Sequence, residues 1–110
     1  MAYDRELADR IRELLASRRG VEEKPMFGGL AFLVNGHMAI AASHTGGLLV
    51  RVRPEDTDKL LERAGVGAMV MGGRDVRGWL RVDAGALKTK RQLQGWVARG
   101  TDSVRDLPPK

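Results

Sequence analysis

The side chains best suited to catalysis or metal binding are His37 and His44, the only two histidines of the 110-residue chain. They are seven positions apart, so one strand running through both would place them on opposite faces, where they could not share a metal ion without a bulge. Cysteine is absent and no H-x-x-x-H pair occurs, which removes the usual zinc-ligand patterns. The neighbouring Ser43 lacks the G-x-S-x-G setting of a hydrolase nucleophile. We therefore predict no metal, no cofactor, no catalytic residue and no enzymatic activity.

Arginine and tryptophan side chains follow the two-residue period of two predicted strands. Over residues 48–53 one side is wholly aliphatic and the other carries Leu49 and two arginines; over residues 78–82, Leu80 and Val82 alternate with a tryptophan and an arginine. If the aliphatic sides form the core, the other sides share one outer face that carries Arg51, Arg53, Trp79 and Arg81. Arginines beside an aromatic ring can hold a phosphate backbone and stack a base. Alternatively, these side chains cover apolar surface or pair with acidic groups across a dimer interface, which is the interpretation that we favour.

The net positive charge is concentrated near the C-terminal end. The chain has 19 basic and 14 acidic side chains, a net charge of +5. Residues 1–73 carry ten of each kind, whereas residues 74–110 carry nine basic and four acidic. This surplus could form an electrostatic footprint for a polyanion around the last helix, with contacts from Lys88, Lys90, Arg91 and Arg99. The competing interpretation, favoured because no run of five like charges occurs, is a solvated helix surface.

The first half of the chain has local signals of one helix and three strands. Between residues 3 and 19, apolar side chains at positions 7, 11, 14 and 15 have the spacing of an amphipathic helix, which Gly20 would end. Apolar runs at residues 30–34 and 38–42 flank Asn35-Gly36, a pair typical of a type I′ hairpin turn. A second turn at residues 44–47 leads to the strand at residues 48–53. These strands should form an antiparallel meander.

The second half adds a helix, two strands and a final helix. A helix from Pro54 to about residue 64 precedes strands near residues 68–71 and 78–82, which a glycine pair joins. Thr89 and Gln92 form a capping box at the start of the last helix, which Gly100 should weaken. Its apolar stripe contains Leu93, Trp96, Val97 and Val104. The order of elements predicts an α+β fold, in which N-terminal, middle and C-terminal helices pack an antiparallel sheet made of a hairpin meander and two later strands.

Length and composition indicate one globular domain over residues 1–110. The apolar fraction is 43% and the charged fraction is 30%, both near the average for globular chains. No apolar run approaches the roughly 18–20 residues of a membrane span, and no signal-peptide segment follows the polar first residues. Together with the absence of cysteine, these features predict a cytoplasmic protein that does not contact a membrane.

Several motifs carry a resemblance to a known family. They are Met26-Phe27-Gly28-Gly29, the hairpin around Asn35-Gly36, the strand at residues 47–52 and the glycine-rich turn and aromatic strand at residues 72–82. Together they resemble the N-terminal domain of the TfoX/Sxy family of competence regulators, over nearly the whole chain. The resemblance implies an α+β sheet domain in a bacterial cytoplasmic protein. It implies no catalytic residue.

The resemblance also implies an association with regulation. Some relatives act with the cyclic-AMP receptor protein to switch on DNA-uptake genes, and those regulators have a C-terminal domain with helical-hairpin character. Because this chain ends without such a segment, we expect a stand-alone copy of the N-terminal domain.

The glycines of the Met26–Gly29 motif allow two interpretations. Next to Phe27, Gly28 and Gly29 could let a ligand or a partner backbone approach closely. They could instead form a bulge or bend that starts the sheet. We favour the structural role for all the motif residues, Met26, Phe27, Gly28, Gly29, Asn35 and Gly36.

Two classes of function remain. The first is a non-enzymatic regulatory or interaction domain that contacts a protein partner or a second copy in a homodimer. It is favoured because the strand at residues 30–34 is apolar on both faces, as if another chain covered it. The alternative is weak, sequence-nonspecific DNA or RNA binding through the basic last helix or the arginine face of the sheet.

Overall fold

One antiparallel sheet organises the chain in this computed structural model, which describes residues 3–26, 28–44, 46–71 and 73–108. Neighbouring strands follow the order β1-β2-β3-β4-β6-β5, so the last two strands are exchanged relative to their order in sequence. The strands are β1 (Val21–Met26), β2 (Gly29–Val34), β3 (His37–Ala42), β4 (Leu48–Arg51), β5 (Val66–Met71) and β6 (Arg74–Val82).

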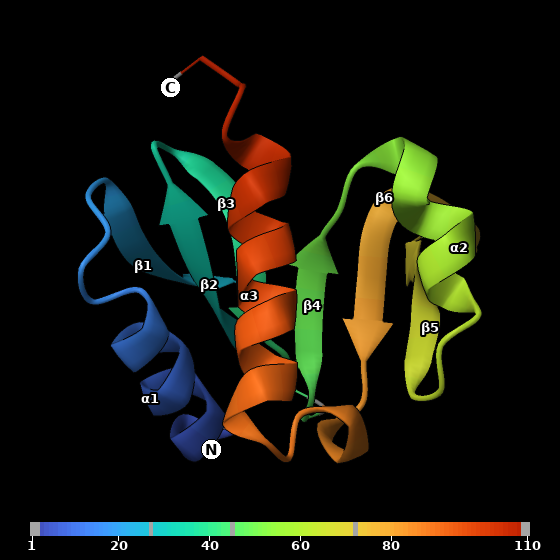
Figure 1. Ribbon diagram of the computed structural model, residues 1–110, viewed down its shortest axis with the longest axis horizontal. Helices are drawn as coiled ribbons and strands as arrows, with labels where there is room; N and C mark the ends of the chain where they lie inside the picture. The colour runs from blue at the N-terminus through green and yellow to red at the C-terminus, as the bar shows by residue number, and fades with distance from the viewer. Residues whose placement is uncertain (1–2, 27, 45, 72, 109–110) are drawn as a thin grey trace.

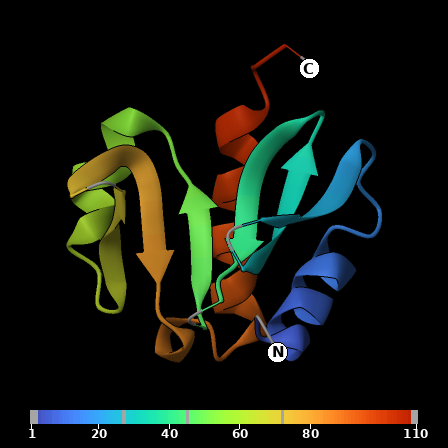
Figure 2. The ribbon, with the colours of Figure 1, turned by 180° about the vertical axis from the view of Figure 1, so that it is seen from behind.

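The described helices lie on one side of this sheet (Figure 1). α1 (Arg5–Leu14) lies beside α3 (Lys90–Val104), which packs on β3 and β4, while α2 (Thr57–Leu61) packs near β5 and β6. Seen from behind, the opposite face of the sheet has none of these helices across it (Figure 2). The predicted α+β fold, with N-terminal, middle and C-terminal helices, is confirmed. Within the described residues, no helix combines the length and the apolar character that a membrane crossing requires.

The core lies between the sheet and the helices. Four side chains in register across the central strands are almost fully buried: Phe32, Ile40, Val50 and Leu80. The predicted apolar stripe of α3 belongs to the same buried cluster, through Leu93, Trp96, Val97 and Val104. Because strand side chains alternate between two faces, the remaining strand residues point away from the helices.

Two local sequence signals are confirmed. Asn35 and Gly36 have φ angles of +52° and +86°, as the two central residues of a type I′ turn require. At the start of α3, the Thr89 hydroxyl accepts a hydrogen bond from the Gln92 amide at 3.0 Å, and the Gln92 side-chain oxygen accepts one from the Thr89 amide at 2.9 Å. The hairpin between β2 and β3 and the beginning of α3 are therefore set by short-range chemistry.

Other boundaries differ from the prediction. α1 ends at Leu14 instead of near residue 19, and Gly20 precedes β1, where its carbonyl accepts a hydrogen bond from the Asn35 amide at 2.8 Å. The second helix begins with a 3₁₀ turn at Pro54–Asp56, and α2 ends at Leu61. The strand β1 was not predicted, because its polar residues show no apolar alternation. It lies at the edge of the sheet, where proline is tolerated.

An ion pair between Arg12 of α1 and Glu23 of β1 connects the first helix to the sheet edge. Arg12 Nε and Nη2 each donate to a different Glu23 carboxylate oxygen at 2.6 Å. The hydrogen bonds from Arg12 lower the pKa of Glu23 below its ordinary value. Since the pKa is lower in the folded state, the pair stabilises the fold above the ordinary glutamate pKa of about 4.3, and this contribution is lost as the pH falls through the folded-state value.

The substitution Glu23→Gln should therefore lower the melting temperature at neutral pH and bring the variant closer to the wild type in acid. Thermal unfolding followed by circular dichroism across this pH range measures the difference. Glu13→Gln is the control, because it removes an exposed carboxylate from the same helix as Arg12 and away from the open face of the sheet. If the difference in melting temperature between Glu23→Gln and the wild type did not change with pH, the prediction would be contradicted.

Candidate interaction surfaces

The sheet face turned away from the helices, which we call the open face, is formed by the side chains that alternate with the core set. One row in register across β2, β3, β4 and β6 consists of Ala31, Ala41, Leu49 and Arg81. In the next row, Arg51 of β4 lies opposite Trp79 of β6. The open face also includes Met26, Met38, Met69 and Val70, which line its groove.

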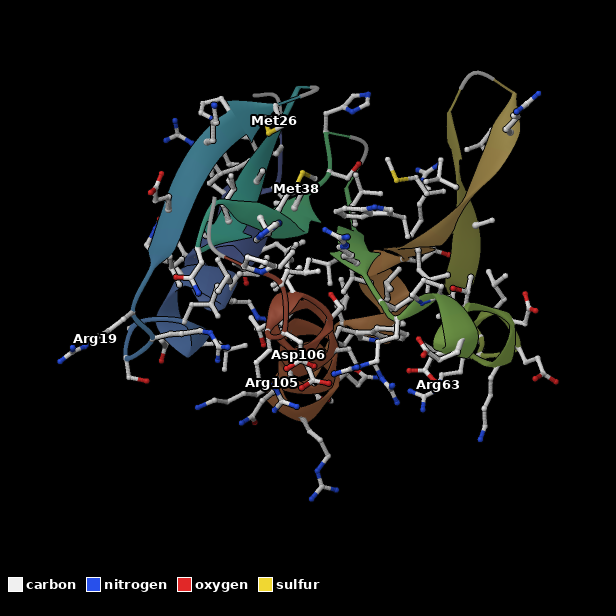
Figure 3. The ribbon with its side chains drawn as sticks, turned by 90° about the horizontal axis from the view of Figure 1, so that it is seen from above. Arg19, Met26, Met38, Arg63, Arg105 and Asp106 are labelled. Carbon is white, nitrogen blue, oxygen red and sulfur yellow. The ribbon has the colours of Figure 1, made fainter. Side chains whose placement is uncertain are left out.

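Three methionines from separate strands line this apolar groove of about 250 Å³. Met26 belongs to β1, Met38 to β3 and Met69 to β5, where the pairing with β6 is shifted by a bulge. Figure 3 shows Met26 and Met38 on the side of the sheet away from α3. Val70, also on the groove, is 57% exposed, the only large hydrophobic residue so exposed in the described part of the chain. The groove therefore presents flexible, apolar side chains to whatever binds there.

Small aliphatic side chains continue the open face beside and along the groove. Ala31 and Ala41 are buried, with 0% and 4% of their surface exposed, yet neither belongs to the core cluster on the helix side. Leu33 and Leu49, on the same face, are half-buried. The strand at residues 30–34 is therefore apolar on both faces, as the sequence indicates, but helices cover only one of them among the described residues.

The predicted outer face is correct for Arg51, Trp79 and Arg81, whereas Arg53 lies beyond the end of β4 and its guanidinium turns to the last helix. The first three lie on the open face, where Arg51 and Trp79 are half-buried and Arg81 is exposed. β4 ends at Arg51, but burial still alternates through Val52 and Arg53, and Arg53 borders one hollow with Arg51 and Trp79. Its guanidinium donates to Asp102 of α3 at 3.2 Å, which raises the pKa of Arg53, and it lies 3.6 Å from Asp106. Arg53 connects the end of the sheet to the last helix.

The two histidines lie on different sides of the sheet. His37 Nε2 is 2.6 Å from the carbonyl oxygen of Pro108, which follows α3. His44 lines the groove of the open face. The two rings therefore do not converge, in agreement with the odd separation of the residues. No group of three His, Cys, Asp or Glu side chains suited to a metal ion occurs within the described ranges.

The basic residues assigned to the last helix separate into two groups. Lys88 and Lys90 are exposed at its N-terminal end. Arg91 and Arg99 line a hollow of about 440 Å³ between α2 and α3, together with Arg63, which follows α2. Sequence reasoning missed Arg63 because it lies outside the basic C-terminal segment. Only the fold, which places the segment after α2 beside Trp96 of α3, brings it to this hollow.

The glycine motif at the entrance to β2 is in close contact with the protein's own backbone. Phe27 lies outside the described residues, and Gly28 has a positive φ of +77°. A Cβ atom on Gly29 would overlap the carbonyl oxygen of Ala42 on β3. The space beside Gly29 is therefore occupied by a neighbouring strand, which supports the structural interpretation of this residue.

Comparison with known proteins gives one match. Residues 13–104 match a family model described as the TfoX N-terminal domain, which covers most of the chain and all the surfaces described above. No curated protein and no solved structure was found to match the chain.

Proposed function

The chain belongs to the TfoX N-terminal domain family, and from this premise we propose that it is a regulatory domain without catalytic activity, which acts by binding a second copy of itself through the open face. The observation that carries the proposal is the methionine-lined groove on a sheet face that no described helix covers. Apolar surface of this kind, framed by polar side chains, is typical of protein interfaces. Methionine side chains adapt their shape to a partner surface at little cost.

A two-fold interface suits the distribution of side chains on this face. Two-fold symmetry places the same patch of each copy against the other, so the apolar groove of one chain meets that of its partner. At the margin, Glu22 and Lys24 of β1 alternate to the open face and give each copy one acidic and one basic group. Arg51 and Trp79 extend the patch with residue types that are enriched in interfaces.

The substitution Met38→Glu should convert the dimer into a monomer. A carboxylate on the groove would lose its water in the dimer interface, and an uncompensated buried charge costs about 3–5 kcal/mol, so dimerisation should weaken at least ~100-fold. Sedimentation equilibrium over a range of protein concentrations measures the association, and circular dichroism verifies the fold. The matched control is Gln94→Glu, which adds the same charge to an exposed position of α3.

Two results would contradict this function. One is a wild-type chain that remains monomeric at every concentration. The other is a Met38→Glu variant that associates as strongly as Gln94→Glu. In either case the groove would not hold a second copy of this chain.

A further inference from the structure

A second surface, independent of the open face, has an unusual charge. The hollow between α2 and the N-terminal half of α3 is lined by Arg63, Arg91 and Arg99, and no acidic side chain lines it among the described residues. Within the same described part of the chain, none of these three arginines forms an ion pair with a carboxylate, whereas Arg12 and Arg53 do. Three guanidinium groups around one hollow repel one another, and an anion between them would relieve this repulsion.

We propose that this hollow, which we call the arginine hollow, binds a small anion that carries a multiply charged phosphate group. A guanidinium group presents its N–H donors in a planar fork that matches phosphate oxygens, so three arginines can bind several oxygens of one phosphate. The combined charge of the arginines balances two to three negative charges, about the charge of a phosphomonoester or a pyrophosphate. A volume of about 440 Å³ accommodates such a group.

Trp96 orients two of the arginines. Trp96 is buried, with 6% of its surface exposed, and the guanidinium carbons of Arg63 and Arg99 lie over the ring, 5.7 Å and 6.0 Å from its centroid. Such cation–π contacts stabilise the guanidinium positions before any ligand arrives, which reduces the side-chain entropy lost on binding. Because the arginines and the surrounding protein cover the indole, a base could not stack on it without displacing them. This favours a compact phosphate over a nucleic-acid strand that binds by stacking.

The N-terminus of α3 adds to the positive potential. Arg91 lies in the first turn of the helix, where unpaired backbone amides give the helix end a partial positive charge. The segment before the helix is fixed, since Arg10 Nη2 donates to the carbonyl oxygen of Leu87 at 2.8 Å. Acidic side chains, Asp56 and Glu62, line the adjoining hollow that Arg63 and Arg99 also border. Their negative charge repels a phosphate from the adjoining hollow, so the phosphate should bind in the arginine hollow.

The test is to titrate the whole chain with inorganic pyrophosphate at low ionic strength and to measure binding by isothermal titration calorimetry. Arg63→Gln and Arg99→Gln should each weaken binding by about 10-fold or more, because a hydrogen bond to a charged group contributes about 1.5–3 kcal/mol. The control is Arg19→Gln, which removes an exposed arginine far from Arg63 (Figure 3). Fluorescence gives a second readout. In a Trp79→Phe background Trp96 is the only tryptophan of the chain, and its fluorescence should change when pyrophosphate binds.

Three outcomes would overturn the proposal. The first is the absence of pyrophosphate binding by the unaltered chain. The second is binding that Arg63→Gln and Arg99→Gln leave unchanged. The third is binding of duplex DNA without binding of pyrophosphate, which would assign the basic surface to a nucleic acid. Since Met38 lies on the open face, Met38→Glu should retain pyrophosphate affinity, and the two proposals can fail separately.

Discussion

Replacing Gly100 of α3 by alanine should destabilise the protein by about 2 kcal/mol, although alanine is about 1 kcal/mol better than glycine inside an isolated helix. A Cβ atom at this position would lie 2.6 Å from Ile40 Cγ1, 2.9 Å from the carbonyl oxygen of Ala39 and 3.1 Å from Val50 Cγ2. The second of these atoms belongs to the backbone of the sheet, so relief of the overlap requires α3 and β3 to separate. Gly100 therefore permits the close packing of the last helix on the central strands.

Gly95 provides the matched control on the same helix. A Cβ atom there would meet nothing within 4 Å, so Gly95→Ala should stabilise the protein by about 0.5–1 kcal/mol through helix propensity alone. Urea unfolding of both variants, monitored by far-ultraviolet circular dichroism, measures the two free energies of unfolding. Relative to the wild type, the free energy of unfolding should fall for Gly100→Ala and rise for Gly95→Ala. If Gly100→Ala proved as stable as Gly95→Ala, α3 would not be held to the sheet at this glycine.

Gly100 also illustrates what sequence can and cannot reveal about this fold. From the sequence it is a helix-weakening residue, because propensity is a local property. Its packing role depends on Ile40 of β3 and Val50 of β4, which are distant from it in the sequence. By contrast, the Asn35-Gly36 turn and the capping box of Thr89 and Gln92 were predicted correctly. The backbone angles of the turn and the hydrogen bonds of the capping box each depend on no more than four consecutive residues.

The candidate surfaces also combine features that the local sequence predicts with features that only the fold produces. Strand alternation correctly predicts that Trp79 and Arg81 share a face, because the two-residue period is a local property. The sequence does not show that the guanidinium of Arg53, just beyond β4, turns to Asp102 of α3. The groove could not be predicted, since its methionines come from strands that are not neighbours, and Met69 reaches it from a bulge. The arginine hollow depends in the same way on the fold, which brings Arg63, after α2, beside Trp96 of α3.

The replacement of Gly29 by alanine should have the largest effect on stability, with an expected loss of about 3 kcal/mol. The overlap is between the new Cβ atom and the carbonyl oxygen of Ala42, and the backbone at Ala42 pairs with both β2 and β4. Movement of this carbonyl would disturb hydrogen bonds on both sides of β3. Thermal and urea unfolding should therefore both show a large decrease, because the overlap outweighs the smaller stabilisation that alanine gives by lowering the entropy of the unfolded chain.

Gly67 is the control for this substitution because it is also a strand glycine. It lies on β5 opposite Arg81, and a Cβ atom there would meet nothing within 4 Å, so Gly67→Ala should leave stability unchanged or raise it by at most about 1 kcal/mol. The comparison decides between the two interpretations of the glycine motif. If Gly29 exists to admit a ligand or a partner backbone, Gly29→Ala would fold as stably as Gly67→Ala and lose only binding. If Gly29 exists because β3 occupies the space beside it, the stability of the isolated chain falls without any ligand present, which is the result that the position of the Ala42 carbonyl leads us to expect.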